Sequence, residues 1–364
     1  MFLKNNLRMW HISCLTTLPP DPDAGGSAGL APGARNPGRG PATAPRLPLW
    51  RRARRRFYWL LVLAVAGVAE LLPVGIGRAS GVRLARMALR VRGRERRLAE
   101  ANLALALPDL EPAARVSLLA ASADAAGRNL FDTLAAGRLL ARPGSVADLP
   151  DADGRGLVDV VAAEQAAGRG VVVLSGHLGC WELHGAWLAR ELAARGCGPL
   201  HAVAGTVRNP AVDRWLTRRR EGLGLRLLRR EDGAGPVLEC LRAGGVVAIL
   251  VDQNTGVDSV PVPFLGRPAP TPTGPARLAV AARATVVVTA LARRDDGSGH
   301  DVWHAPAWRA DAAAPRDGQV VACLRWVNGR LEERIRRNPA EWVWYHRRWE
   351  SLQETTAAAE NTRT

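Results

Sequence analysis

The chain has 364 residues, which is enough to bury a sizeable core in one large domain or two smaller ones. Its 50 Lys and Arg residues against 34 Asp and Glu residues give a formal net charge of +16. This excess suits an anionic partner such as nucleic acid, a membrane surface or an acidic substrate, although a GC-rich genome also inflates basic charge. The five cysteines show no C-x-x-C spacing, so we expect neither a zinc site nor a disulfide framework, and a reducing compartment.

The N-terminal part changes character abruptly. Residues 1–50 are rich in Pro, Gly and Ala without a sustained apolar period, which predicts a disordered extension. Residues 51–97 hold an apolar run, Phe57–Ala69, with clusters of arginine on both sides and Tyr58 and Trp59 at its edge. Paired basic flanks and interfacial aromatics favour a membrane-anchoring or interfacial helix, whether it spans or lies flat. A signal peptide and a buried core helix are the alternatives.

Residues 98–352 have the pattern of one folded domain, followed by a disordered tail at 353–364. The domain begins with helical periodicity up to residue 140, with a possible split near Gly127, and continues with apolar strands that alternate with helices. This order predicts an α/β fold with a layered, mostly parallel sheet, flanking helices and functional loops at the carboxyl ends of the strands. The expected strands are Val171–Leu174, Leu200–Ala204, Leu225–Leu228, Val246–Val251 and Thr285–Leu291.

The stretch after the first of these strands carries the candidate catalytic residues. A Ser-Gly turn places His177 at the end of the strand, and Glu182 follows in the first turn of a helix. We expect Glu182 to hold one imidazole nitrogen, which leaves the other nitrogen of His177 free to accept a proton. Such a general base has no nucleophile of its own, so the nucleophile is a hydroxyl of the substrate. A surface His–Glu pair is the alternative, and Cys180 is interpreted as a small packed residue.

Further polar residues follow later strands. Arg208 and Asn209 form a basic motif in which a guanidinium suits phosphate or carboxylate, and Asp252 and Gln253 follow the strand Val246–Val251. The run at 218–220 is interpreted as solvated arginines. Thr271 or Thr273 is expected to cap the next helix.

An aromatic and basic cluster lies near the C-terminus, from Asn338 to Trp349, and contains Arg348. It predicts either a docked terminal helix with snorkelling arginines or a lid that contacts a lipid headgroup.

Together these motifs resemble one family. They are His177-x4-Glu182 behind a Val-rich strand, Arg208-Asn-Pro, Asp252-Gln, Val260-Pro-Val-Pro-Phe-Leu-Gly-Arg-Pro-Ala-x-Thr, and Pro339-x-x-Trp-x-Trp-x-His-Arg-Arg-Trp. Over residues 57–350 the chain resembles the lipid A biosynthesis (lauroyl/myristoyl) acyltransferases, within the lysophospholipid-type acyltransferases that share a His-x4-Asp/Glu motif. The long N-terminal extension and the proline in Thr273-Gly-Pro-Ala depart from the family pattern.

The resemblance implies an α/β acyltransferase sheet behind an N-terminal membrane helix, at the cytoplasmic face of the bacterial inner membrane. It also implies acyl carrier protein as the acyl donor, a glycolipid hydroxyl as the acceptor, and no metal or cofactor. His177 matches the family base and Glu182 its partner. Backbone amides at the start of the catalytic helix, with Arg208, are expected to stabilise the oxyanion. The residues expected to bind substrate are Arg208, Asn209, Asp252, Gln253, Arg267 and Arg348.

Three alternatives remain at this point. The first is another glycolipid acceptor, such as a phosphatidylinositol mannoside, which related actinobacterial enzymes acylate. A nucleic-acid-binding protein would also be basic, but only the C-terminal cluster interleaves arginine with aromatic residues, so no nucleic-acid partner is expected. A non-enzymatic membrane scaffold would not depend on His177.

Overall fold

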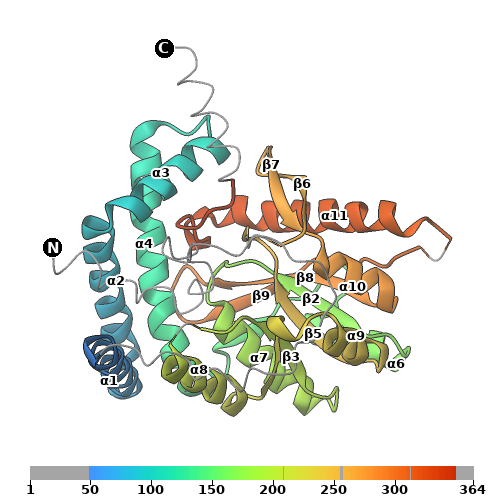
Figure 1. Cartoon of the computed structure of the whole chain (residues 1–364), viewed down its shortest axis with the longest axis horizontal. Helices are drawn as coiled ribbons and strands as arrows, with labels where there is room; N and C mark the ends of the chain where they lie inside the picture. Colours follow the sequence, from blue (N-terminus) through green and yellow to red (C-terminus); the bar gives the residue numbers. More distant parts are fainter. Residues whose placement is uncertain (1–48, 208, 255–256, 312, 350–364) are drawn as a thin grey trace, which may run out of the picture.

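The computed structural model describes residues 49–349 except 208, 255, 256 and 312. The extension predicted at 1–50 and the tail predicted at 353–364 therefore lie outside the described residues, apart from residues 49 and 50. The described chain forms a seven-stranded sheet in the order β1-β9-β8-β2-β5-β3-β4, with helices on both faces (Figure 1). Only the β8–β9 pair is antiparallel among the paired strands of this sheet. The predicted α/β fold with a mostly parallel sheet and flanking helices is confirmed.

All five strands expected from the sequence are present, and β1 and β9 are additional. The strands are β1 Val146–Asp148, β2 Val171–Ser175, β3 Leu200–Ala204, β4 Leu225–Arg229, β5 Val246–Leu250, β8 Thr285–Arg293 and β9 His300–His304. A separate hairpin, β6 Ser259–Phe264 and β7 Arg267–Pro272, projects from the domain (Figure 1).

The central strand β2 is buried along its whole length because both faces of the sheet are covered. Successive side chains of a strand point to opposite faces. Val172 and Leu174 accordingly contribute to one apolar core, together with α10, α11 and the C-terminal tryptophans. Val171 and Val173 contribute to the other core, together with α6 and α7.

The helices around the sheet follow the expected alternation. They are α5 Ala136–Leu140, α6 Leu157–Ala166, α7 Trp181–Ala194, α8 Pro210–Gly222, α9 Gly235–Arg242, α10 Gly274–Ala282 and α11 Arg316–Arg337. Thr273 occupies the N-cap position of α10, but its hydroxyl bonds the Asp258 carboxylate at 2.8 Å and does not cap the helix. The predicted capping role is therefore wrong for Thr273.

Four N-terminal helices lie together at one end of the sheet (Figure 1): α1 Leu49–Leu71, α2 Val74–Val91, α3 Gly93–Ala106 and α4 Pro112–Leu134. Helices α2 and α4 touch at Gly81 and Gly127, where a Cβ on Gly81 would lie 2.2 Å from the Gly127 carbonyl oxygen. Helix α4 runs unbroken through Gly127, so the predicted split there is wrong. The glycine serves the close helix contact, and the break comes at Ala135 instead.

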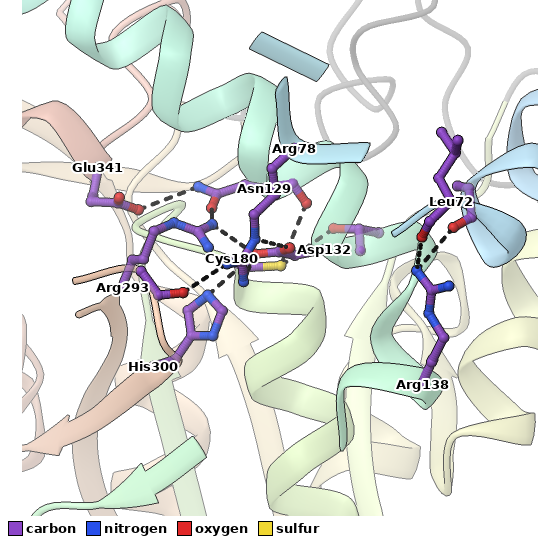
Figure 2. Close-up of polar contacts among 12 residues, drawn as sticks. Leu72, Arg78, Asn129, Asp132, Arg138, Cys180, Arg293, His300 and Glu341 are labelled. Atoms are coloured by element: carbon purple, nitrogen blue, oxygen red, sulfur yellow. Dashed lines mark hydrogen bonds and ion pairs between the residues drawn. The ribbon is translucent and has the colours of Figure 1, made fainter. Parts of the chain in front are cut away.

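Helix α1 ends where Pro73 interrupts the chain, and Arg138 binds its last turn. The Arg138 guanidinium donates to the Glu70 and Leu72 carbonyl oxygens, each at 2.7 Å (Figure 2). These carbonyls are acceptors that a helix end leaves without an internal partner. Within residues 49–349, as far as they are described, no helix combines the length and apolar character that a membrane span requires. The membrane-anchoring role of residues 51–97 stays a prediction.

Candidate active site

The site forms where two neighbouring parallel strands end. Strands β2 and β5 pair in register from Val171–Val246 to Ser175–Leu250, so their carboxyl ends lie side by side. His177 follows β2 by two residues and Asp252 follows β5 by two residues. Polar residues 75 positions apart in the sequence therefore meet at one edge of the sheet, where open α/β sheets place their binding sites.

The imidazole of His177 is held by the Asp252 carboxylate. Its Nδ1 lies 2.7 Å from Asp252 Oδ1, and its backbone N–H donates to Asp252 Oδ2 at 2.7 Å. Gly176 permits this approach, because a Cβ there would lie 2.8 Å from Asp252 Oδ2. With Nδ1 engaged by a carboxylate, Nε2 is the nitrogen that can accept a proton.

Asp252 is almost completely buried and keeps its negative charge. Burial by itself raises the pKa of this carboxyl, but the charge and hydrogen bond of His177 and the hydrogen bond from Trp342 lower it to below its ordinary value. The indole N–H of Trp342 donates to Asp252 Oδ2 at 2.8 Å. The carboxylate is thus fixed by three donors, two from His177 and one from Trp342.

Glu182 does not hold the imidazole, which corrects the pairing expected from the sequence. Its carboxylate forms an ion pair with Arg220 of α8, whose Nε donates to Oε2 at 3.0 Å. Burial raises the pKa of Glu182, but the charge of Arg220 lowers it by more than burial raises it. The pKa of Glu182 is therefore below its ordinary value. The reason is geometric: Glu182 lies in the first turn of α7 and faces α8, whereas Asp252 comes from the adjacent strand end.

His177 lines a cavity of about 520 Å³, a size typical of small-molecule and cofactor sites. Strand β3 pairs with β5 over only three residues, Leu200–Ala202. Residues of both strands that follow this pairing line the cavity. The lining comes from both helix layers, with Leu188 of α7 on one side and Val237 of α9 on the other. The cavity is mainly apolar. The polar and charged residues in its lining include Glu182, Arg220, Gln253, Thr289, Arg230, Asp258 and Arg277.

The other predicted substrate-binding residues have different positions. Gln253 lines the cavity, whereas the Asn209 side chain caps α8 by accepting from the Ala211 N–H at 3.0 Å. Arg267 is exposed at the start of β7, in the hairpin, and does not line the cavity. Arg208 lies outside the described residues.

Arg348 is fully buried beneath the hairpin, so the structure does not bring it to the cavity. Its guanidinium donates to Thr271 Oγ1 at 3.0 Å and to the Pro270 carbonyl, and it lies 4.7 Å from the Phe264 ring centroid. Burial lowers its pKa to about 10. The role visible for Arg348 is to hold the hairpin onto the domain.

Comparisons with known proteins identify the family of this chain. The family model for bacterial lipid A biosynthesis acyltransferases matches residues 47–351. The chain belongs to the bacterial lipid A biosynthesis acyltransferase family. The resemblance inferred from the sequence motifs is thereby confirmed, and the residues that carry it include the His177 and Asp252 of the site.

The individual relatives carry two different names. The lipid A biosynthesis lauroyltransferase of Escherichia coli K12 is 27% identical over 308 residues, 82% of this chain and 93% of that relative. A phosphatidylinositol mannoside acyltransferase of Mycobacterium tuberculosis is 29% identical over 191 residues, 51% of this chain. The chain spans 57% of that mannoside acyltransferase and 58% of its Mycolicibacterium smegmatis counterpart.

The C-terminal family motif supplies the residue that sequence reasoning missed. The segment after α11 is a short 3-10 turn, Pro339–Glu341, followed by a bridge at Trp342 and then by turns and bends, so the predicted docked helix is wrong here. Trp342 bridges back to the turn after β2 and donates to Asp252. The sequence motif contains Trp342 but does not indicate that Asp252 is its partner. Because Trp342, Trp344 and Trp349 are buried, they offer no surface on which nucleic-acid bases could stack.

Cys180 lies between His177 and Glu182 in the sequence but is not placed as a nucleophile. It is buried, and burial is the main cause that raises its thiol pKa to about 12. Its Sγ contacts the Thr133 hydroxyl and the Asn129 carbonyl at 3.5 Å each. Among the residues that the structure describes, no group of His, Cys, Asp and Glu is arranged to hold a metal ion.

A second buried carboxylate, that of Asp132 in α4, lies near Cys180 (Figure 2). It pairs with Arg78 of α2 at 2.8 Å, Arg293 of β8 at 2.7 Å and His300 of β9 at 3.3 Å. Burial raises its pKa, but the His300 hydrogen bond and the two arginine charges lower it to well below its ordinary value. We call these four residues the Asp132 cluster.

Proposed function

We propose that the protein transfers a fatty acyl group from an acyl thioester to a hydroxyl of a glycolipid. The observation that carries this proposal is the His177 imidazole, held at Nδ1 by the buried Asp252 carboxylate and facing a largely apolar cavity of about 520 Å³. A positioned base beside an apolar cavity suits the deprotonation of a hydroxyl next to a bound acyl chain.

The proposed reaction has two steps. In the first, Nε2 of His177 takes the proton of the acceptor hydroxyl as its oxygen attacks the thioester carbonyl carbon, and the carbonyl electron pair moves onto oxygen. In the second, the tetrahedral intermediate collapses, the carbon–sulfur bond breaks, and the leaving thiolate takes the proton from the imidazolium. The products are an ester and a free thiol. Asp252 orients the imidazole and stabilises its positive charge during both steps.

The oxyanion needs donors, and the first turn of α7 offers them. Helix α7 begins at Trp181, four residues after His177, and the first turn of a helix presents backbone N–H groups. Helix N-termini favour negative charge. Glu182 and Arg220 form an ion pair in the cavity wall, and we assign them the role of fixing α7 against α8.

For the donor we propose acyl carrier protein, and for the acceptor a lipid A precursor. The acceptor choice rests on the E. coli lauroyltransferase, because its similarity extends over 82% of this chain. The mannoside acyltransferases match about half of the chain, which keeps a phosphatidylinositol mannoside as the second candidate acceptor.

We further propose that helices α1 and α2 hold the protein at the cytoplasmic face of the bacterial inner membrane. Large apolar side chains on both helices are exposed, and α2 also carries several arginines. Apolar side chains beside basic ones suit insertion among anionic headgroups. The exposed apolar residues of this surface are Trp50, Phe57, Leu60, Leu63, Val65, Val68, Leu71, Ile76, Leu84, Met87 and Val91.

The test uses membranes that contain either the wild type or His177→Ala, incubated with radiolabelled acyl-carrier-protein thioesters and a panel of glycolipid acceptors. We expect labelled product on thin-layer chromatography with wild type, and a loss of about 10²–10⁴-fold in rate with His177→Ala. The acceptor that becomes labelled identifies the substrate.

Equal transfer by both proteins, or no transfer to any acceptor, would contradict the proposed chemistry. A stable acyl adduct on Cys180 would contradict direct transfer. Thermal unfolding of both proteins serves as the control that His177→Ala remains folded.

A further inference from the structure

A second, smaller hollow lies on the other side of the catalytic turn. It has a volume of about 140 Å³ and is bounded by α2, by α4 and by the C-terminal segment that carries Trp342 and Tyr345. The charged residues Arg92, Glu95 and Arg96, at the junction of α2 and α3, also line it. We call it the α2–α4 groove. Its inner end is formed by Gly179, Cys180 and Trp181, directly after His177.

Small residues on facing helices create this groove. Near Gly81 and Gly127 the two helices touch backbone to backbone. Toward the C-terminal end of α2 the facing residues are alanines, which fill little of the space between the helices. The wall residues are Ala85 and Ala88 of α2, and Ala123 and Ala126 of α4.

Trp181 connects the groove with the main cavity, since its side chain lines both. The indole lies against His177, with ring centroids 4.9 Å apart. The two compartments therefore share one tryptophan, whose ring packs against the imidazole. A transfer reaction must bring two substrates to the same base, and this arrangement provides a separate place for part of each.

The polar groups at the inner end of the groove are occupied by one another (Figure 2). The Asn129 side chain accepts from Arg293 at 2.8 Å and donates to Glu341 at 3.4 Å. The Cys180 thiol contacts Thr133 and the Asn129 carbonyl. What the inner end offers a ligand is thus mainly apolar surface, which suits a hydrocarbon chain better than a sugar or a phosphate.

The outer side of α2 indicates where such a chain comes from. Leu84, Met87 and Val91 are exposed at helical spacing and run beside Ala85 and Ala88 of the groove wall. This stripe is part of the surface that we assign to the membrane, so a chain that leaves the bilayer along α2 reaches the groove first.

We propose that the α2–α4 groove binds an acyl chain that the acceptor lipid already carries. The inference rests on the proposed function and extends it by assigning one acyl chain of the acceptor to a place of its own beside Trp181. The donor's acyl chain occupies the larger cavity.

The test fills the groove from each wall in turn. Ala126→Leu on α4 and Leu89→Trp on α2 change half-buried lining residues, and Ala120→Leu is the matched control on the exposed side of α4. We expect both groove variants to raise the KM for the acylated acceptor by about tenfold, the effect of excluding roughly two methylene groups. The KM for the lauroyl-acyl-carrier-protein donor should stay within about twofold of the control.

A second measurement does not require turnover. Equilibrium binding of the tritiated acylated lipid A precursor, in detergent micelles without donor, should weaken about tenfold in Ala126→Leu relative to Ala120→Leu. Unchanged binding in both groove variants would overturn the groove assignment, as would a change in donor KM or donor chain-length preference instead. Absence of acyl transfer by the wild type contradicts the proposed function alone, because lipid binding still decides the groove.

Discussion

Two buried carboxylates, Asp252 and Asp132, are alike in burial and charge but differ in the groups that they pair with. Each is at most 1% exposed, and each has a pKa below its ordinary value in spite of burial. Asp132 is paired with two guanidinium groups, from Arg78 and Arg293, which are always charged. Asp252 accepts from an indole and from His177, whose imidazole can gain or lose a proton.

The difference separates a structural cluster from a catalytic one. The Asp132 cluster joins α2 and α4 to β8 and β9, and its two guanidinium groups neutralise the charge of Asp132 (Figure 2). The pair formed by Asp252 and His177 is open to a ligand, because Asp252 is buried and its partner His177 lines the cavity. A perturbed pKa alone marks both sites, and the partner and its access to a ligand decide which one can perform chemistry.

The largest expected effect is that of Asp252→Asn on catalysis. The amide keeps the size of the side chain but removes the charge that stabilises the imidazolium and fixes its tautomer. We expect kcat to fall by about 10²–10⁴-fold, with a much smaller change in thermal stability. The measurement is steady-state transfer with saturating donor and acceptor.

Asp301→Asn is the matched control, because this partly buried carboxylate pairs with Arg294 at 2.7 Å away from the cavity. Its kcat should be close to that of wild type. If Asp252→Asn retained wild-type kcat, the comparison between the two carboxylates would lose its basis.

The counterpart is Asp132→Asn, whose main effect falls on stability. The substitution leaves Arg78 and Arg293 without their counter-charge in a mostly buried position, and removing one partner of a buried ion pair costs about 3–5 kcal/mol in the free energy of unfolding. Guanidinium-induced unfolding measures this loss. The kcat of the protein that remains folded should change far less than in Asp252→Asn.

Asp124→Asn provides the control, since Asp124 pairs with Arg86 across the same two helices but at the surface. It should destabilise much less than Asp132→Asn. An Asp132→Asn protein that is as stable as the Asp124→Asn protein would show that the buried cluster does not hold the helices to the sheet.

Much of this fold followed from the sequence, because its central strands are continuous apolar runs. The runs that became β2 and β5 also placed His177 and Asp252 at strand ends, and parallel strands bring such ends together. His177 and Asp252, the latter expected as a substrate-binding residue, were therefore predictable as residues of one site.

Which carboxylate holds the imidazole was not predictable. Glu182 lies five residues from His177 and Asp252 lies 75 residues away, and spacing alone favours the neighbour in sequence. The register of β2 with β5 and the direction in which α7 leaves the turn decide otherwise. The predicted substrate-binding role of Arg348 is not supported for a related reason. The sequence motif shows that the residue is basic, but it does not show that the hairpin buries it.

The smallest of the expected effects is a dependence of stability on pH that arises beside the Asp252 pair. His346 is buried with its ring centroid 6.2 Å from that of His177, and burial lowers its pKa to about 3. The unfolded chain, with an ordinary pKa near 6.5, binds this proton when the folded protein does not. The free energy of unfolding therefore falls as the pH drops below about 6.5, by roughly 3 kcal/mol between pH 6.5 and 4 for this one group.

His346→Phe tests that origin, because it keeps an aromatic ring 4.9 Å from the Trp342 ring and removes the titrating group. Urea-induced unfolding at pH 6.5, 5.5 and 4.5 should show a shallower loss of stability in the variant than in wild type. Both Asp252 and Asp132 stay ionised over this range, since each pKa lies below its ordinary value. An equally steep loss in the variant would show that His346 does not cause the pH dependence of stability. The cause would then be another buried histidine, such as His184, whose pKa burial lowers to about 4.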